Sequence, residues 1–183
     1  MWLIFSLTRW RRVFARIERL PVPSIAVING HCLGGGLELA MCCDFRLCKK
    51  CIKIGLPEIN IGMIPGWGGA ARLPRIVGLG RAKEMILLAK LLDADTAKDY
   101  GLVNEVYESY DELKQGAAEY AQKLMSLPPH VIALDKLIID DAYKTGPNAV
   151  YDCLALAYCF TTSDSIEGLD AFLEKRKPVF SGQ

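Results

Sequence analysis

The sequence predicts an α/β fold in which the strands come early and the helices come late. An apolar, β-branched run at residues 24–28 has the composition of a buried strand. A turn with three consecutive glycines follows it, and residues 37–41 then favour a helix. Two more short strands are expected at residues 44–47 and 51–54, whereas the chain after residue 70 has mostly helical patterns.

Helical periodicity and helix-ending residues define the remaining elements. Apolar residues recur at helical spacing in residues 8–20, and two prolines then end that helix. Residues 56–69 are so rich in Gly and Pro that a shaped loop is expected there. Asp95 is an expected helix N-cap, and Asp164 with Glu167 is an expected capping box. The later helices are expected at residues 70–77, 81–88, 95–101, 110–126, 130–145, 148–160 and 164–176.

Composition excludes some classes of function. A chain of 183 residues is long enough to bury a real core. Its 22 basic and 21 acidic residues give a net charge of +1, so charge provides no argument for a nucleic-acid partner or an anionic membrane. Hydrophobic residues make up 51% of the chain, which is rich for a monomer of this size. An apolar subunit interface is therefore expected.

Cysteine usage favours a reducing compartment. The chain has seven cysteines and no secretory signal pattern, so an intracellular, cytoplasmic location is expected, or a mitochondrial one in a eukaryote. The apolar residues 1–7 are too few to span a bilayer. Cys48 and Cys51 form a lone C-x-x-C pair in a chain with only two histidines. Ordinary thiols are expected there, and no metal site.

The glycine turn is the first candidate for chemistry. Its glycines lie where a strand hands over to a helix, and glycine is used where the backbone takes unusual dihedral angles or approaches a ligand closely. The start of a helix offers free N–H groups and partial positive charge, which suit a bound anion or an oxyanion formed in a reaction. Glu38 lies in the first turn of that helix. The alternative is a simple glycine turn followed by a surface glutamate that stabilises the helix dipole.

A second carboxylate, Glu58, begins the Gly- and Pro-rich loop. If the fold brings Glu58 and Glu38 together, the pair can hold a water molecule and transfer protons. Unlike environments can also drive the pKa values of two such groups apart, so that one serves as acid and the other as base. Taken alone, Glu58 is better explained as a surface carboxylate in a turn.

Four blocks of the chain resemble signatures of the crotonase (enoyl-CoA hydratase/isomerase) superfamily, and most closely those of the enoyl-CoA hydratases. The blocks are PSIAVINGHCLGGGLELAMCCD at residues 23–44, GLPEINIGMIPGWGGAARL at 55–73, GLVN at 101–104 and EGLDAFLEKRKP at 167–178. The resemblance implies a crotonase-like ββα spiral core in residues 1–108. It also implies a C-terminal helical trimerisation region in residues 109–183.

The resemblance implies a reaction as well. Crotonases bind acyl-CoA thioesters and stabilise an enolate on the thioester oxygen with two backbone N–H groups. Gly35 matches the second of these donors, Glu38 matches the base that activates water, and Glu58 matches the acid that protonates Cα. The implied function is the reversible syn addition of water to a 2-enoyl-CoA in fatty acid β-oxidation. The coenzyme A thioester is the substrate, and no other cofactor is implied.

Further positions match the substrate-binding part of the family. Trp67 either shortens the acyl pocket or serves packing alone. The ring of Phe172 and the ammonium group of Lys175 would reach the acyl-CoA of a neighbouring subunit, in a homotrimer or a dimer of trimers. The substrate-binding residues implied in this way are Gly34, Gly66, Trp67, Gly68, Phe172 and Lys175.

The sequence departs from the family at its N-terminal side. Full-length relatives have an earlier segment that supplies several strands, the first oxyanion donor and the main contacts to the adenine of CoA, and residues 1–7 contain nothing like that donor's motif. Three alternatives stay open. The chain is a hydratase, with a possible partner that supplies the missing segment, or a non-catalytic subunit that acts in oligomerisation, or another crotonase-type acyl-CoA isomerase or hydrolase.

Overall fold

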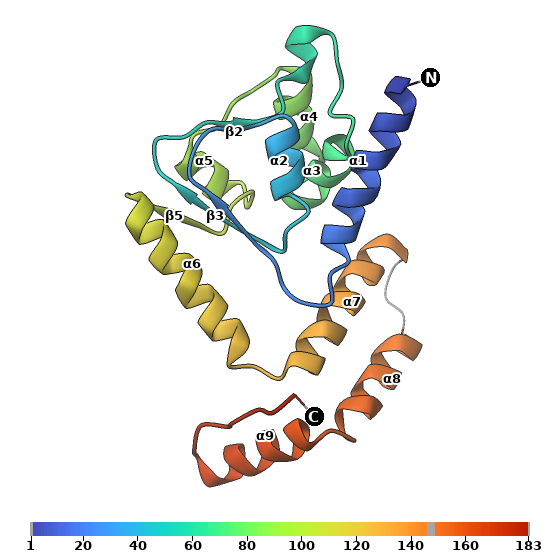
Figure 1. The fold of residues 1–183 in the computed structure, drawn as a ribbon, viewed down its shortest axis with the longest axis vertical. Coiled ribbons are helices and arrows are strands. Elements are labelled where there is room, and N and C mark those ends of the chain that lie inside the picture. The colour runs from blue at the N-terminus through green and yellow to red at the C-terminus, as the bar shows by residue number, and fades with distance from the viewer. Residues whose placement is uncertain (1, 146–148, 183) are drawn as a thin grey trace. The chain divides into compact units, whose positions relative to one another are not determined.

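The computed structural model describes residues 2–145 and 149–182 (Figure 1). It contains two compact units, one formed by residues Met1–Leu20 and Ser24–Ala118 and the other by Pro21–Pro23 and Glu119–Gln183. The predicted division into a core region, 1–108, and a C-terminal helical region, 109–183, stays a prediction. The predicted helix break at residues 146–147 lies outside the described residues.

The first unit is built on short parallel strands. β1 (Ile25–Ile28), β3 (Phe45–Lys49) and β5 (Glu105–Tyr107) form one sheet in the order β1-β3-β5, and β2 (Cys32–Leu33) pairs with β4 (Ile54–Gly55) in a second sheet. The central strand β3 is almost wholly buried, as expected for a parallel sheet with covered faces. The α/β prediction is therefore confirmed in this unit.

Helices cover these sheets and complete one apolar core. Among the fully buried side chains are Leu37, Leu73 and Met85, which come from three different helices. The helices of this unit are α1 (Trp2–Glu18), α2 (Gly35–Ala40), the 3-10 helix η1 (Glu58–Ile61), α3 (Gly69–Val77), α4 (Leu79–Leu87) and α5 (Ala94–Asp99). Helix α1 starts earlier than predicted, and η1 lies inside the segment predicted as a loop.

The buried arginine of β3 joins distant parts of this unit. The side chain of Arg46 donates to the carbonyl of Leu102 at 2.7 Å and to that of Cys43 at 2.6 Å. The side-chain oxygen of Asn104 accepts the Arg46 N–H at 2.8 Å, which fixes the chain just before β5. The pKa of Arg46 is lowered because burial disfavours its charge.

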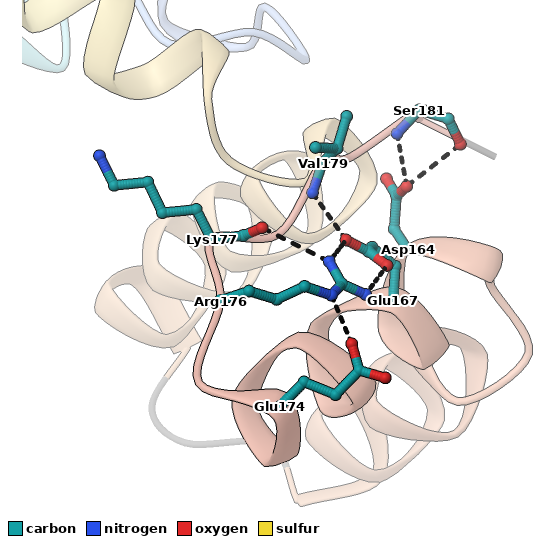
Figure 2. Close-up of polar contacts among 7 residues, drawn as sticks. All are labelled: Asp164, Glu167, Glu174, Arg176, Lys177, Val179 and Ser181. Carbon is teal, nitrogen blue, oxygen red and sulfur yellow. Dashed lines mark hydrogen bonds and ion pairs between the residues drawn. The ribbon is translucent and has the colours of Figure 1, made fainter.

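The second unit is helical. Helix α6 (Tyr110–Met125) begins in the first unit and ends in the second, followed by α7 (Pro129–Thr145), α8 (Ala149–Cys159) and α9 (Ser163–Glu174). The C-terminal tail is bound back onto α9 (Figure 2). Asp164 accepts the N–H groups of Ser181 at 2.7 Å and Gly182 at 2.9 Å, and Glu167 accepts that of Val179 at 2.8 Å.

Two predicted helix caps are wrong. Asp93, not Asp95, caps α5, because Asp93 has the extended backbone of a cap and its side chain accepts the Thr96 N–H at 2.8 Å. Thr162 caps α9 by accepting the Ser165 N–H at 3.2 Å. Asp164 lies one residue inside α9, where its carboxylate binds the tail instead of forming the predicted capping box.

No helix in the described part of the chain is both long and apolar enough to cross a membrane.

Candidate active site

The pairing of β2 with β4 brings the glycine turn beside the second carboxylate. Cys32 is in register with Ile54, and the Gly34 N–H donates to the carbonyl of Gly55 at 3.0 Å. Glu58 follows Gly55 by three residues, so the same pairing carries its side chain to the turn. The structure thereby joins two segments that are about twenty residues apart in sequence.

Glu38 is buried under the loop that precedes α3. Only 2% of its surface is exposed, and its Oε1 atom accepts the N–H of Trp67 at 2.9 Å and of Gly69 at 2.8 Å. A Cβ added at Gly69 would lie 2.9 Å from the same oxygen and 2.9 Å from Cβ of Pro65. Glycine at this position therefore permits the close approach of loop and carboxylate. Among the described residues, none donates to the other oxygen, Oε2.

Glu58 reaches the other side of the turn. A Cβ added at Gly34 would lie 3.2 Å from Oε1 of Glu58, and Gly34 itself has a φ of 53°. Oε2 of Glu58 is buried and has no hydrogen-bond partner among the described residues. Burial of this carboxyl raises its pKa, and the charge of Glu38 raises it further. A buried carboxyl oxygen without a partner is costly to retain and is typical of functional sites.

Trp67 covers the turn from a third direction. A Cβ added at Gly35 would collide with its indole ring, so the ring lies directly against this glycine. The ring also packs against Trp10 and Phe14 of α1, with centroids 5.5 Å and 5.8 Å away. Gly68, with a φ of 112°, completes the tight turn that leads into α3. That conformation favours glycine.

The predicted site residues therefore fall into two groups. Glu38 and Glu58 converge on the turn that contains Gly34 and Gly35, and the segment that contains Gly66, Trp67 and Gly68 lies over Glu38. The remaining two predicted residues, Phe172 and Lys175, belong to the second unit, at the end of α9. Phe172 is 81% exposed, and Lys175 adopts the left-handed conformation that ends the helix.

Sequence reasoning missed Arg72. It gave this residue no role, although Arg72 lies inside the second resembling block and one helical turn after Gly68. In the structure its guanidinium donates to the carbonyl of Trp67 at 3.1 Å and pairs with Glu18 of α1. The available signal in the sequence was that Arg72 follows Gly68 by four residues.

Cys48 and Cys51, the predicted pair of ordinary thiols, lie in different environments. Cys48 is buried and Cys51 is exposed, and burial raises the pKa of Cys48 to about 11. A thiol with a raised pKa is a poor nucleophile and a poor metal ligand. Within the described residues, no group of three or more His, Cys, Asp or Glu side chains could hold a metal ion.

Comparison with known proteins identifies the family. Residues 7–183 match the family model described as enoyl-CoA hydratase/isomerase. The chain belongs to this family. The crotonase resemblance is thus confirmed.

Relatives and solved structures agree with that assignment. The crotonyl-CoA hydratase of Syntrophomonas wolfei is 42% identical over 172 residues, which are 93% of this chain and 66% of the relative. The short-chain-enoyl-CoA hydratase of Clostridium acetobutylicum is 41% identical, over 91% of this chain and 64% of the relative. The chain spans about two thirds of the length of these relatives.

The fold is also found in a crystal structure. That of the enoyl-CoA hydratase from Bacillus anthracis superimposes with a TM-score of 0.92 and 39% identity, over 99% of this chain and 70% of that one. A crotonase-like α/β fold with parallel sheets, shorter than that of the full-length relative, is therefore confirmed.

Proposed function

We propose that this chain carries the two carboxylates of an enoyl-CoA hydratase, which add water to the double bond of a 2-enoyl-CoA thioester. The observation that supports this most is the convergence of Glu38 and Glu58 on one glycine turn with different hydrogen-bonding environments. Hydration needs a base for the water and an acid for the carbon, and two carboxyl groups in unlike environments can divide these tasks.

Glu38 is proposed as the base. Two loop N–H groups hold Oε1, so the direction of the carboxylate is fixed before substrate arrives. The second oxygen is then available to take a proton from water as that water attacks Cβ. Burial of the carboxylate strengthens its interaction with the reacting water.

Glu58 is proposed as the acid. Its raised pKa favours the protonated form, which is the form that can deliver a proton to Cα. The Gly35 N–H, at the start of α2, is proposed to stabilise the enolate oxygen, a contribution that is typically about 2.7–4 kcal/mol per donor. Trp67, which lies against Gly35, would then bound the space for the acyl chain. Gly34, Gly66 and Gly68 would keep the backbone close to substrate.

The second unit is proposed to contribute binding rather than chemistry. The exposed Phe172 and Lys175 would contact the acyl group and the phosphates of CoA bound to a neighbouring subunit, which requires a trimer or a dimer of trimers. Sedimentation of the purified protein with and without acyl-CoA tests the assembly. A monomer at every concentration would contradict it.

The activity is tested by the loss of crotonyl-CoA absorbance, with separation of the CoA products. Glu38→Gln and Glu58→Gln are each expected to lower the rate by about 10²- to 10⁴-fold. Glu112→Gln, at an exposed position of α6, is the matched control and should leave the rate unchanged. A folded protein that forms no 3-hydroxyacyl-CoA would refute hydration by this chain alone. A shifted double bond or free CoA as product would indicate an isomerase or a hydrolase.

A further inference from the structure

Arg72 joins the loop over Glu38 to the first helix. Its side chain is 12% exposed and belongs to α3, directly after the loop. Nη1 donates to the carbonyl of Trp67 at 3.1 Å. Nε and Nη2 donate to the two carboxylate oxygens of Glu18, at 3.3 Å and 3.1 Å. All three nitrogens of the guanidinium are therefore used in directed contacts.

Arg72 contacts the Trp67–Gly68 peptide group. This group lies between the two N–H groups that donate to Glu38. The Trp67 N–H precedes that peptide group and the Gly69 N–H follows it, and both point at Oε1 of Glu38. Arg72 binds the carbonyl that lies between them. If this peptide group rotated, the two N–H groups could no longer converge on one oxygen.

The backbone of Gly68 is shaped to admit the guanidinium. Its φ of 112° disfavours any residue with a side chain, and a Cβ at this position would collide with Nη1 of Arg72. The carbonyl of Gly68 in turn accepts the backbone N–H of Arg72 at 3.0 Å. The turn and the arginine are thus mutually fitted, through both side chain and backbone.

Glu18 gives the arginine a fixed anchor. A carboxylate that binds a guanidinium through two parallel hydrogen bonds holds the planar group in one orientation. The ion pair also offsets the arginine charge. A lysine at this position would supply the charge but not the three directed hydrogen bonds.

We propose that Arg72 is a positioning residue for Glu38: anchored by Glu18, it holds the Trp67–Gly68 peptide group so that two loop N–H groups fix Oε1 and leave Oε2 toward the reactants. The geometric part stands on contacts within the first unit. The consequence for rate rests on the proposed hydratase function.

The geometric part is tested without substrate, by NMR of the ¹⁵N-labelled protein. The Trp67 and Gly69 amides both bind Oε1 of Glu38, so their hydrogen-exchange protection reports on this part of the loop. In Arg72→Lys, hydrogen-exchange protection of both amides should fall by about tenfold, which corresponds to one charge-assisted hydrogen bond. Arg75→Lys changes an exposed arginine on the same helix and should alter protection less than about twofold.

Glu18→Gln provides a second variant, which retains Arg72 and weakens its anchor. It should lower the hydrogen-exchange protection of the same two amides by a smaller factor. If Arg72→Lys does not fold, Glu18→Gln alone tests the proposal. Unchanged hydrogen-exchange protection of both amides in the folded variants would overturn the proposal.

The effect on rate is measured separately. If the protein hydrates crotonyl-CoA, Arg72→Lys should lower kcat by about tenfold and alter KM by less than about twofold, because orientation of the base acts on the chemical step. Displaced amides with an unchanged kcat would overturn the positioning role. A wild-type protein that shows no hydration would refute the proposed function, while the amide measurements still decide whether Arg72 holds the loop.

Discussion

Acidic side chains in the two units differ in their countercharge. In the first unit, Glu38 accepts two loop N–H groups, and Glu58 has a buried oxygen without a partner among the described residues. In the second unit, Glu167 also binds both terminal nitrogens of Arg176, at 2.6 Å and 2.8 Å. Figure 2 shows this guanidinium between the carboxylates of Glu167 and Glu174.

The difference changes the pKa values of these carboxyl groups in opposite directions. The Arg176 contact and the Val179 N–H lower the pKa of Glu167 to about 2, whereas burial raises the pKa of Glu58. An arginine partner stabilises the charged form of a carboxyl group. Glu58 has no such partner, and its raised pKa favours the protonated form more than in an ordinary carboxyl group.

The largest contrast is expected from one added methyl group in each region. In Gly69→Ala the new Cβ would lie 2.9 Å from Oε1 of Glu38 and from Pro65, so the loop must move and stability should fall by about 1–3 kcal/mol. If the protein hydrates crotonyl-CoA, that activity should be lost with it. In Gly168→Ala, on α9, the new Cβ meets only the Phe180 ring at 3.6 Å. That variant should gain about 0.5–1 kcal/mol from helix propensity.

Urea denaturation followed by circular dichroism, together with the crotonyl-CoA assay, measures both effects. Equal and small changes in the two variants would show that the close approach of Gly69 to Glu38 is not a constraint.

The next effect concerns the buried acid of the second unit. Asp164 is 3% exposed and accepts the N–H groups of Ser181 and Gly182, so Asp164→Ala should cost about 1–3 kcal/mol by leaving tail donors unsatisfied. Asp170→Ala, at an exposed position of the same helix, is the control. Carboxypeptidase should shorten the tail of Asp164→Ala faster than the tail of the wild type or of Asp170→Ala. Equal rates would mean that these hydrogen bonds do not hold the tail.

Local patterns predicted the elements that are long or strongly marked. The strand at residues 24–28 became β1, and the run after the glycine turn became α2, because both follow from side-chain type over a few neighbouring residues. The convergence of Glu38 and Glu58 could not be predicted in this way. It depends on β2 and β4, two strands of two residues each, and such short strands leave no periodicity.

The errors have the same physical origin. Asp93 and Asp95 are both good N-cap residues, and only the backbone conformation decides between them. Asp164 was assigned to a cap because its spacing to Glu167 fits a capping box. Both residues bind the C-terminal tail, which lies more than ten residues later in the chain. Local sequence patterns therefore cannot show that the tail competes with the helix end for these carboxylates. The role of Arg72 likewise depends on Glu18, which is 54 residues away.

Glu58 and Glu167 should respond oppositely to removal of their charge. Glu58→Gln is expected to raise the midpoint of urea denaturation at pH 7, because the wild-type carboxyl has a raised pKa and therefore destabilises the fold where the unfolded chain is ionised. The gain should disappear as the pH falls below the ordinary value of 4.5, where both states are protonated. A Glu58→Gln protein that is less stable at pH 7 would contradict burial as the cause.

The smallest effect is expected at Glu167, which is exposed enough for solvent to weaken its ion pair. Its pKa is lowered from 4.5 to about 2, so its stabilising contribution is complete above pH 4.5 and is lost as the pH falls toward 2. Glu167→Gln should therefore denature at lower urea than wild type at pH 6. The gap should narrow as the pH approaches 2, and 1 M salt should narrow it at pH 6 by screening. A gap that stays constant with pH would assign the tail contacts to hydrogen bonding alone, and the contrast with Glu58 would then depend on burial rather than on countercharge.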